Sequence, residues 1–100
     1  MKIEFTTPAL NDLEDLRLYF SKRSESGLRN ILLEIEDAIK TIPDNISSGR
    51  PTPRDDVREK ITTKYGFLVP YHVRGNILYI LRIYRSMRKP LDYDKIIRLT

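Results

Sequence analysis

Residues 65–84 read YGFLVPYHVRGNILYILRIY, and this stretch decides the fold. Four apolar side chains fall on one face of its first half: Phe67, Val69, Tyr71 and Val73. Such alternation predicts a strand that is buried on one side. Gly75 and Asn76 form a two-residue hairpin signal before a second run, Ile77–Tyr84, so the stretch predicts an antiparallel hairpin. Proline cannot donate to the strand ladder, and we therefore expect a bulge at Pro70.

Two amphipathic helices are predicted upstream of this hairpin. Seven apolar residues share one face of the clearer helix: Leu28, Ile31, Leu32, Ile35, Ala38, Ile39 and Ile42. Charged residues take its other face, and Pro43 ends it. Before it, Thr7 and Pro8 fit an N-cap followed by proline at the first helical position, which starts a helix over about Pro8–Arg23. Residues Ser24–Gly27 are expected to join the helices into an αα-hairpin, whose apolar stripes need a sheet to cover them.

The remaining segments complete an α+β order. Lys2–Thr6 and Val57–Thr63 alternate apolar and polar residues and are predicted strands, whereas Asp44–Asp56 is a loop rich in proline and serine. We expect an N-terminal strand, a helical hairpin packed on an antiparallel β-sheet and a short C-terminal element, in the order β-α-α-β-β-β. The pattern of residues 91–100 fits a short helix or a last strand. Residues 1–100 are expected to form one domain, because this length is enough for one core.

The composition excludes several classes of site. The chain has no cysteine, which rules out disulfides, thiolate nucleophiles and cysteine-ligated zinc, and its one histidine, His72, rules out a histidine-rich metal site. We therefore expect no cofactor and no metal. His72 lacks a second histidine or an Asp/Ser pattern nearby and is interpreted as a polar surface residue without a catalytic role. The carboxylate pairs Asp12/Asp15 and Glu34/Asp37 are interpreted as solvated or paired with basic neighbours on polar helix faces.

Hydropathy and charge indicate the localisation of the chain and the kind of partner that it binds. The first ten residues lack the apolar core of a signal peptide, and no apolar run approaches the roughly 18 residues of a membrane span. We predict a cytoplasmic protein without a membrane partner. Residues 1–49 carry six Lys/Arg and nine Asp/Glu, a net −3, whereas residues 50–100 carry twelve and five, a net +7. This asymmetry indicates a polyanionic or acidic protein partner for one face, and a solvated mixed-charge surface is the alternative.

Basic residues of the second half form the candidate site. Arg58 and Lys60 have the parity opposite to Val57 and Ile61, so they project from the uncovered face if the helices cover Val57. The closing segment adds basic and aromatic residues: Arg82, Tyr84, Arg85, Arg88 and Lys89, with Tyr93 beyond them. Arginines interleaved with tyrosines indicate an RNA-binding or RNA-cleaving groove, or a docking surface for acidic protein. The structural alternative is charge that guards an exposed edge strand.

Three local motifs give the chain a resemblance to a known family. PDNISSGRP at residues 43–51 resembles the P…GRP loop after the second helix of ParE-like proteins, and Arg58 falls where that group has an arginine entering the next strand. YGFLVPY at 65–71, followed by ILRIYRSMR at 80–88, resembles the ending of the same group. Together with the order of elements, these motifs resemble the ParE/RelE superfamily of toxins from type II toxin–antitoxin modules, and ParE-like plasmid stabilisation proteins most of all.

The resemblance implies a growth-inhibiting toxin that a cognate antitoxin neutralises in a hetero-oligomer. ParE-type members bind DNA gyrase without catalysing a reaction, whereas RelE-type members are mRNA endonucleases that act in the ribosome; a non-toxic member that only binds antitoxin is the third possibility. The implied residues for binding target or antitoxin are Arg58, Lys60, Arg82, Tyr84, Arg85, Arg88 and Lys89. A nuclease would instead use Arg58, Lys60, Arg85 and Tyr93.

Departures from both groups bear on the function. RelE-type nucleases place an arginine in the middle strand, where this chain has Leu68, and a second one aligns with Ser86. Loss of one donor to the transition state typically costs about 2.7–4 kcal/mol of its stabilisation. The histidine common near the end of the last strand in ParE-type members is replaced by Tyr84 or Arg85. The gyrase-binding, non-enzymatic alternative still fits the residues better than the nuclease, because the nuclease would lack both arginines.

Overall fold

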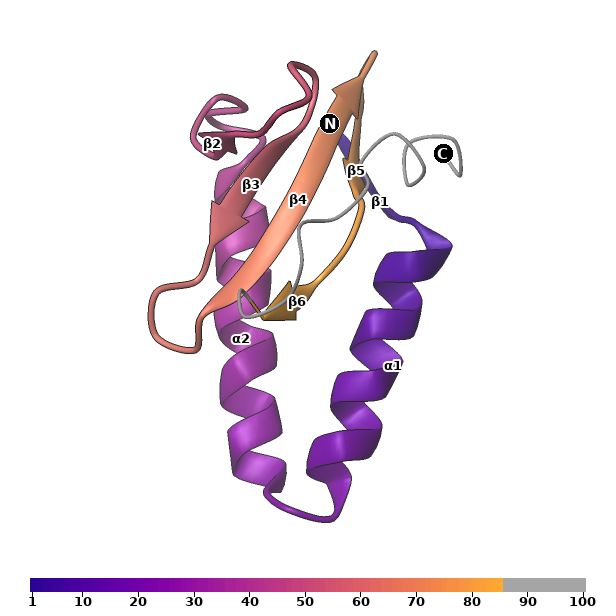
Figure 1. Cartoon of the computed structure of the whole chain (residues 1–100), viewed down its shortest axis with the longest axis vertical. Helices are drawn as coiled ribbons and strands as arrows, with labels where there is room; N and C mark the ends of the chain where they lie inside the picture. The colour runs from indigo at the N-terminus through magenta and orange to yellow at the C-terminus, as the bar shows by residue number, and fades with distance from the viewer. Residues whose placement is uncertain (86–100) are drawn as a thin grey trace.

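The computed structural model describes residues 1–85, in which two antiparallel helices lie on one side of a twisted β-sheet (Figure 1). The predicted α+β order is confirmed, and a two-residue strand, β2, is added within the predicted loop. The elements are β1 (Lys2–Phe5), α1 (Thr7–Ser21), α2 (Glu25–Thr41), β2 (Arg50–Pro51), β3 (Arg58–Ile61), β4 (Phe67–Arg74), β5 (Ile77–Ile80) and β6 (Tyr84–Arg85). The predicted C-terminal element at 91–100 lies outside the described residues.

The sheet is mixed, with the strand order β1-β5-β4-β3-β2 and with β6 paired to β4. The expected hairpin is present: β4 and β5 are antiparallel, and Gly75, with φ +59°, begins the two-residue turn between them. The prediction of a wholly antiparallel sheet is corrected at β1, which pairs in parallel with β5. Parallel neighbours need a long crossover connection, and the first part of that crossover is the helical hairpin that follows β1.

Polar side chains cap both helices, one at a position that the sequence analysis misplaced. Thr6, rather than Thr7, is the N-cap of α1, and its hydroxyl accepts from the backbone N–H of Ala9 at 3.2 Å. The hydroxyl of Ser24 caps α2 by accepting from the N–H of Gly27 at 2.9 Å. Residues Ser24–Gly27 are therefore the start of α2 and not the predicted linker between the helices.

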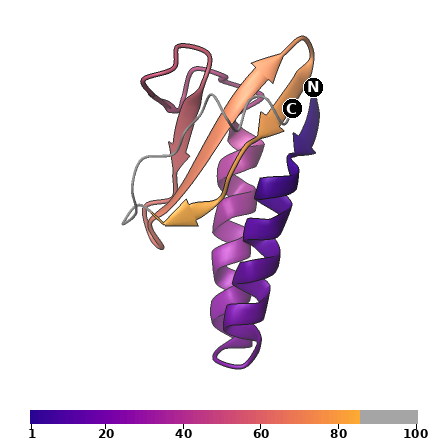
Figure 2. The ribbon, with the colours of Figure 1, turned by 45° about the vertical axis from the view of Figure 1, so that its right-hand side comes forward.

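The core lies between the helices and one face of the sheet. Its buried residues come from both layers: Ala9, Ile31, Ile35, Ile39, Ile42, Phe67, Val69, Tyr71, Leu78, Ile80 and Ile83. The helical contributors follow the predicted apolar stripe of α2, and alternate residues of β4 face them, as expected for a strand covered on this side. Figure 2 shows that both helices lie on the same side of the sheet.

A bulge lies opposite Pro70 and not in the strand that contains it. Strand β4 runs through Pro70 without interruption, but the register changes from Tyr71↔Ile80 to Leu68↔Tyr84. Residues 81–83 of the partner strand therefore face only residues 69 and 70 of β4, which defines a bulge of one extra residue. The ladder is interrupted opposite Pro70, which has no backbone N–H, so the bulge leaves no proline donor unpaired.

Candidate partner-binding surface

The structure places Arg58 and Lys60 on the helix side of the sheet. Directly opposite residues of antiparallel strands project from the same face, and these two face Tyr71 and Val69, which belong to the core. The expected uncovered position rested on the helices covering the Val57 face, and this premise is wrong. It failed because the alternation in this strand shows two faces without showing which one the helices cover.

Both basic side chains reach the loop that follows α2. The guanidinium of Arg58 donates to the carbonyl of Gly49 at 2.8 Å, with the carbonyl of Ser47 at 3.4 Å. The ammonium of Lys60 lies 3.0 Å from the hydroxyl of Ser48. The predicted pair is thus brought together, but both side chains contact the PDNISSGRP loop.

Tyr71, a core residue of β4, also binds this loop. The hydroxyl of Tyr71 donates to the carbonyl of Ile46 at 2.7 Å and accepts from the N–H of Gly49 at 3.0 Å. The loop is therefore fixed by charged donors and by one buried hydroxyl. Sequence reasoning singled out the loop motif but not Tyr71, and the glycine of GRP was the signal for a close backbone approach.

The face away from the helices carries a small polar cluster around Glu59. This residue is only 8% exposed, and its carboxylate lies 3.6 Å from the Arg50 guanidinium and 3.5 Å from the Tyr84 hydroxyl. Tyr84 projects from this face because it pairs with Leu68, which faces Ile61 of β3. Leu68 itself is 5% exposed, so this face has a buried apolar centre and is not an open basic surface.

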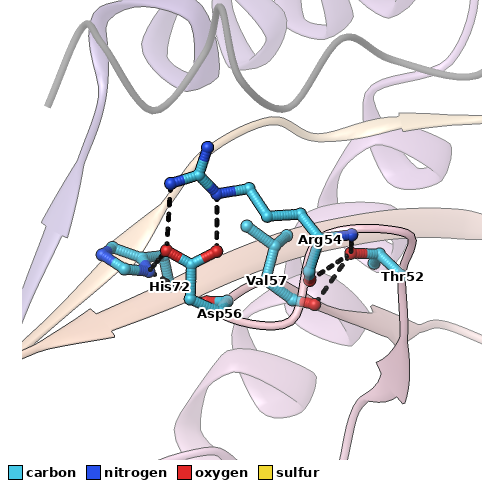
Figure 3. Close-up of polar contacts among 5 residues, drawn as sticks. All are labelled: Thr52, Arg54, Asp56, Val57 and His72. Atoms are coloured by element: carbon cyan, nitrogen blue, oxygen red, sulfur yellow. Dashed lines mark hydrogen bonds and ion pairs between the residues drawn. The ribbon is translucent and has the colours of Figure 1, made fainter.

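A turn before β3 is clipped to β4 through Asp56 (Figure 3). The carboxylate of Asp56 pairs with the guanidinium of Arg54 at 2.5 and 3.2 Å, and this contact holds the pKa of Asp56 below its ordinary value. The hydroxyl of Thr52 donates toward the carbonyls of Arg54 and Val57, both at 2.9 Å, which closes the turn. Side chains of the turn thus close it, and the backbone carbonyl of its Asp56 contacts His72 of β4.

His72 is buried, so its interpretation as a surface residue is wrong. It is 6% exposed, stacks on Tyr79 with ring centroids 6.4 Å apart, and has Nδ1 2.9 Å from the backbone carbonyl of Asp56. A carbonyl only accepts, so this contact requires the proton on Nδ1. Nε2 is buried and has no hydrogen-bond partner within residues 1–85. The His72 ring therefore anchors the turn that contains Asp56 to β4.

Arg82 was predicted to bind a partner, but its guanidinium is engaged within the protein. Its guanidinium makes two bonds to the carboxylate of Asp12 in α1, at 2.6 and 2.9 Å, and these bonds raise the pKa of Arg82. Its ring contact with Tyr84, 6.0 Å from the centroid, is secondary. Asp12 was interpreted as solvated or paired with a basic neighbour; its side chain is only 13% exposed, and its basic partner is the distant Arg82. This pair could not be predicted from the local sequence pattern, because the two residues are 70 positions apart.

Glu34 is the second carboxylate with an unexpected role. Its two oxygens accept from the backbone N–H groups of Lys64 and Tyr65, each at 3.1 Å. The polar face of α2 therefore holds the turn between β3 and β4, and Glu34 is not simply solvated. Asp15 and Asp37 are exposed, as the interpretation of their helix faces predicted.

Arg85 is the most accessible of the predicted basic residues that the structure describes. It pairs with Phe67 and lies on the helix side, with its guanidinium carbon 5.3 Å from the centre of the Phe67 ring. The other predicted residues of the closing segment, Arg88, Lys89 and Tyr93, lie outside the described residues. The described basic residues thus form separate groups: Arg58 with Lys60 at the loop, Arg82 bonded to Asp12 of α1, and Arg85 at the end of β6.

The described part of the chain contains neither a candidate metal-ion cluster nor a membrane-spanning helix. Across residues 1–85, no three His, Asp or Glu side chains are grouped so that they could hold a metal ion. Neither helix in this part is long and apolar enough to cross a membrane. What the arrangement does offer is a set of cations and tyrosines on a rigid sheet, which suits recognition of another macromolecule.

Comparisons with known proteins identify what the chain resembles. The sequence model of a family described as "ParE toxin of type II toxin-antitoxin system, parDE" matches residues 3–90. The solved structure titled "Chromosomal ParDE TA system from P. aeruginosa" is similar with a TM-score of 0.73 and 25% identity, over 85% of this chain and 95% of that chain. "The structure of YoeB dimer from Staphylococcus aureus" is similar with a TM-score of 0.58 and 15% identity, over 86% and 97% of the two chains, which shows the fold alone. No curated protein matches the chain.

Proposed function

Because the chain belongs to the ParE toxin family of type II toxin–antitoxin systems, we propose that it inhibits growth by binding DNA gyrase. The family match over residues 3–90 is the observation that carries this proposal. In the proposal the protein is cytoplasmic, acts without catalysing a reaction, and contributes to plasmid stabilisation where its genes lie on a plasmid. Its charge supports a partner of opposite sign, since the chain carries a net +4 at pH 7.

The second proposed partner is a cognate antitoxin that neutralises the protein in a hetero-oligomer. The proposed contact residues are the exposed Arg85, the half-buried Arg58 and Lys60 beside the loop after α2, and Tyr84, with Arg88 and Lys89 outside the described residues. Arg82 belongs to this set only through its influence on Tyr84 and Arg85, because its own guanidinium is occupied by Asp12. An acidic partner segment suits such a set, because arginine binds carboxylates with paired hydrogen bonds.

A RelE-like endonuclease that cuts ribosome-bound mRNA is the second candidate function. It is favoured by the placement of Arg58 and Lys60 as neighbouring cations on one side of β3, where they suit phosphate contacts. Two observations weigh against it: both side chains already contact the loop after α2, and the middle-strand position of the nuclease arginine holds the buried Leu68. Leucine offers no donor to a phosphate in the transition state.

Two assays run on the same purified protein separate these functions. Inhibition of gyrase supercoiling, together with a DNA-damage response when the protein is expressed without antitoxin, is the expected result. Cleavage of mRNA on programmed ribosomes, with supercoiling unaffected, would replace the gyrase proposal with the nuclease. A protein that does neither, yet binds the product of an adjacent antitoxin gene, would be a relic whose remaining activity is that binding.

A further inference from the structure

Residues 81–83, which belong to no strand, are held by contacts with β4 and with α1 and its N-cap. The N–H of Leu81 donates to the carbonyl of Pro70 at 2.9 Å, and the carbonyl of Leu81 accepts from the hydroxyl of Thr6 at 2.8 Å. The N–H of Ile83 donates to the carboxylate of Asp12 at 2.9 Å. A carboxylate from α1 therefore takes the place of the strand partner that the bulge lacks.

Asp12 makes more of these contacts than any other described side chain. Its oxygens accept from the N–H of Ile83 and twice from the guanidinium of Arg82, at 2.6 and 2.9 Å. One side chain thus binds both the backbone and the side chain of the bulge. Hydrogen bonds to an ionised group are roughly twice as strong as those between neutral groups. The bulge is therefore fixed to the first half of α1 across 70 residues of sequence.

The bulge decides which face each of the next residues occupies. With the extra residue in place, Tyr84 pairs with Leu68 and Arg85 with Phe67. An unbroken continuation of the Tyr71↔Ile80 register would instead place Tyr84 opposite Phe67 and would turn Ile83 out of the core. A slip of one residue inverts every side chain of a strand. The position of Arg85 over Phe67, and of Tyr84 beside Glu59, therefore depends on the bulge.

We propose that Asp12 is a positioning residue for the basic C-terminal strand, because its carboxylate holds the bulge that directs Tyr84 and Arg85 to their faces. The link to activity rests on the proposed function, in which these residues contact the target or the antitoxin. The structural part stands without it. Removal of the Asp12 carboxylate leaves the N–H of Ile83 and the guanidinium of Arg82 without their acceptor, and the strand end then detaches from β4 or slips along it.

Proton NMR of the purified chain tests the structural part directly. Phe67 directs its backbone N–H and carbonyl toward Thr62 and not toward β6, so its Hα faces the Hα of Arg85. The wild type is expected to show an Hα–Hα NOE between Phe67 and Arg85. The Asp12→Ala variant should lose it, or show one between Phe67 and Tyr84. Asp12→Asn keeps one oxygen for Ile83 and should retain a weakened NOE.

A matched control and a functional readout complete the test. Glu14→Ala removes a carboxylate from the same helix whose bond is to the exposed Arg17, and it should leave the NOE unchanged. In the gyrase assay, Asp12→Ala is expected to raise the half-inhibiting concentration by about tenfold or more relative to Glu14→Ala, the loss typical of one displaced hot-spot contact.

Three outcomes would overturn the proposal. An Asp12→Ala variant that melts at a lower temperature but keeps the NOE and full inhibition would make Asp12 a stabilising residue only. Unfolding of both the Ala and the Asn variants would have the same meaning. An intact NOE with lost inhibition would place the effect of Asp12 elsewhere. A wild type that shows the NOE but inhibits nothing would contradict the proposed function and leave the NMR comparison to decide the role of Asp12.

Discussion

Gly49 lies directly against Tyr71, with its N–H 3.0 Å from the tyrosine hydroxyl. A side chain at this position has no room: a Cβ would lie 2.7 Å from Cε1 of Tyr71, 2.8 Å from its hydroxyl oxygen and 3.0 Å from the carbonyl oxygen of Glu59. The glycine of the GRP motif is thus required by the close approach of the loop to a core ring and to a strand backbone. Arg58 and Lys60 bind the same loop, through the carbonyl of Gly49 and the hydroxyl of Ser48.

We expect Gly49→Ala to destabilise the protein by about 1–3 kcal/mol, the usual cost of forcing an extra methyl into a packed site. Neither Tyr71, whose hydroxyl is bonded to Ile46, nor the strand backbone can move aside freely. Urea denaturation measures the change. Ser48→Ala is the matched control, since Ser48 is exposed and, within residues 1–85, its side chain bonds only the Lys60 ammonium. Equal stability of the two variants would show that the loop is free to move away from Tyr71.

Glu34→Ala should lower the free energy of unfolding by about 1–3 kcal/mol, because it leaves two backbone donors of the β3–β4 turn without their charged acceptor. Amide hydrogen exchange at Lys64 and Tyr65 should rise in this variant. Glu36→Ala is the control, since its one ion pair among residues 1–85 is with Lys40 on an exposed face of α2. Unchanged exchange at Lys64 and Tyr65 in Glu34→Ala would argue that water serves these donors equally well.

Periodicity predicted the elements, and it failed where the answer depended on contacts between distant segments. The apolar stripe of α2 and the alternation of β4 are each visible within one element, so the layers followed from them. The strand around Glu59 has two plausible faces, and only its pairing with Val69 and Tyr71 shows which one the helices cover. The bulge then shifts the parity of Tyr84, which no local pattern reveals.

The candidate site was predicted less well than the fold for a related reason. Arginines were identified as free cations from their spacing, yet Arg82 bonds a carboxylate 70 residues earlier in the chain. His72 was interpreted as a surface residue and Glu34 as solvated or paired with a basic neighbour, yet both bind backbone groups of distant turns. A polar residue on an exposed-looking face is easily misassigned when a loop folds over it.

Acid should loosen the turn that carries Asp56. The pKa of this carboxyl lies below its ordinary value because of the bond from Arg54, so the folded turn favours the ionised form. Its contribution to stability is therefore complete above the unfolded pKa of about 4 and is lost as the pH falls through the lowered value. We would follow the NMR chemical shifts of Val57 and the His72 ring from about pH 6 to about pH 2, a range centred on the unfolded pKa of about 4. These shifts should change as Asp56 becomes protonated. An Asp56→Asn variant that shows the same transition would assign it to another group.

Arg82→Ala and Arg85→Ala should separate stability from activity. Arg82 is 28% exposed and bonded twice to Asp12, so its removal leaves a mostly buried carboxylate with only the Ile83 N–H and should cost about 1–3 kcal/mol of unfolding free energy. Arg85 is exposed, and its removal should change stability by no more than about 0.5 kcal/mol while abolishing growth inhibition. Thermal denaturation and growth after induction measure the two effects. Full toxicity of Arg85→Ala would assign this arginine to protection of the strand end, and lost stability without lost toxicity in Arg82→Ala would separate the Asp12 contact from the activity.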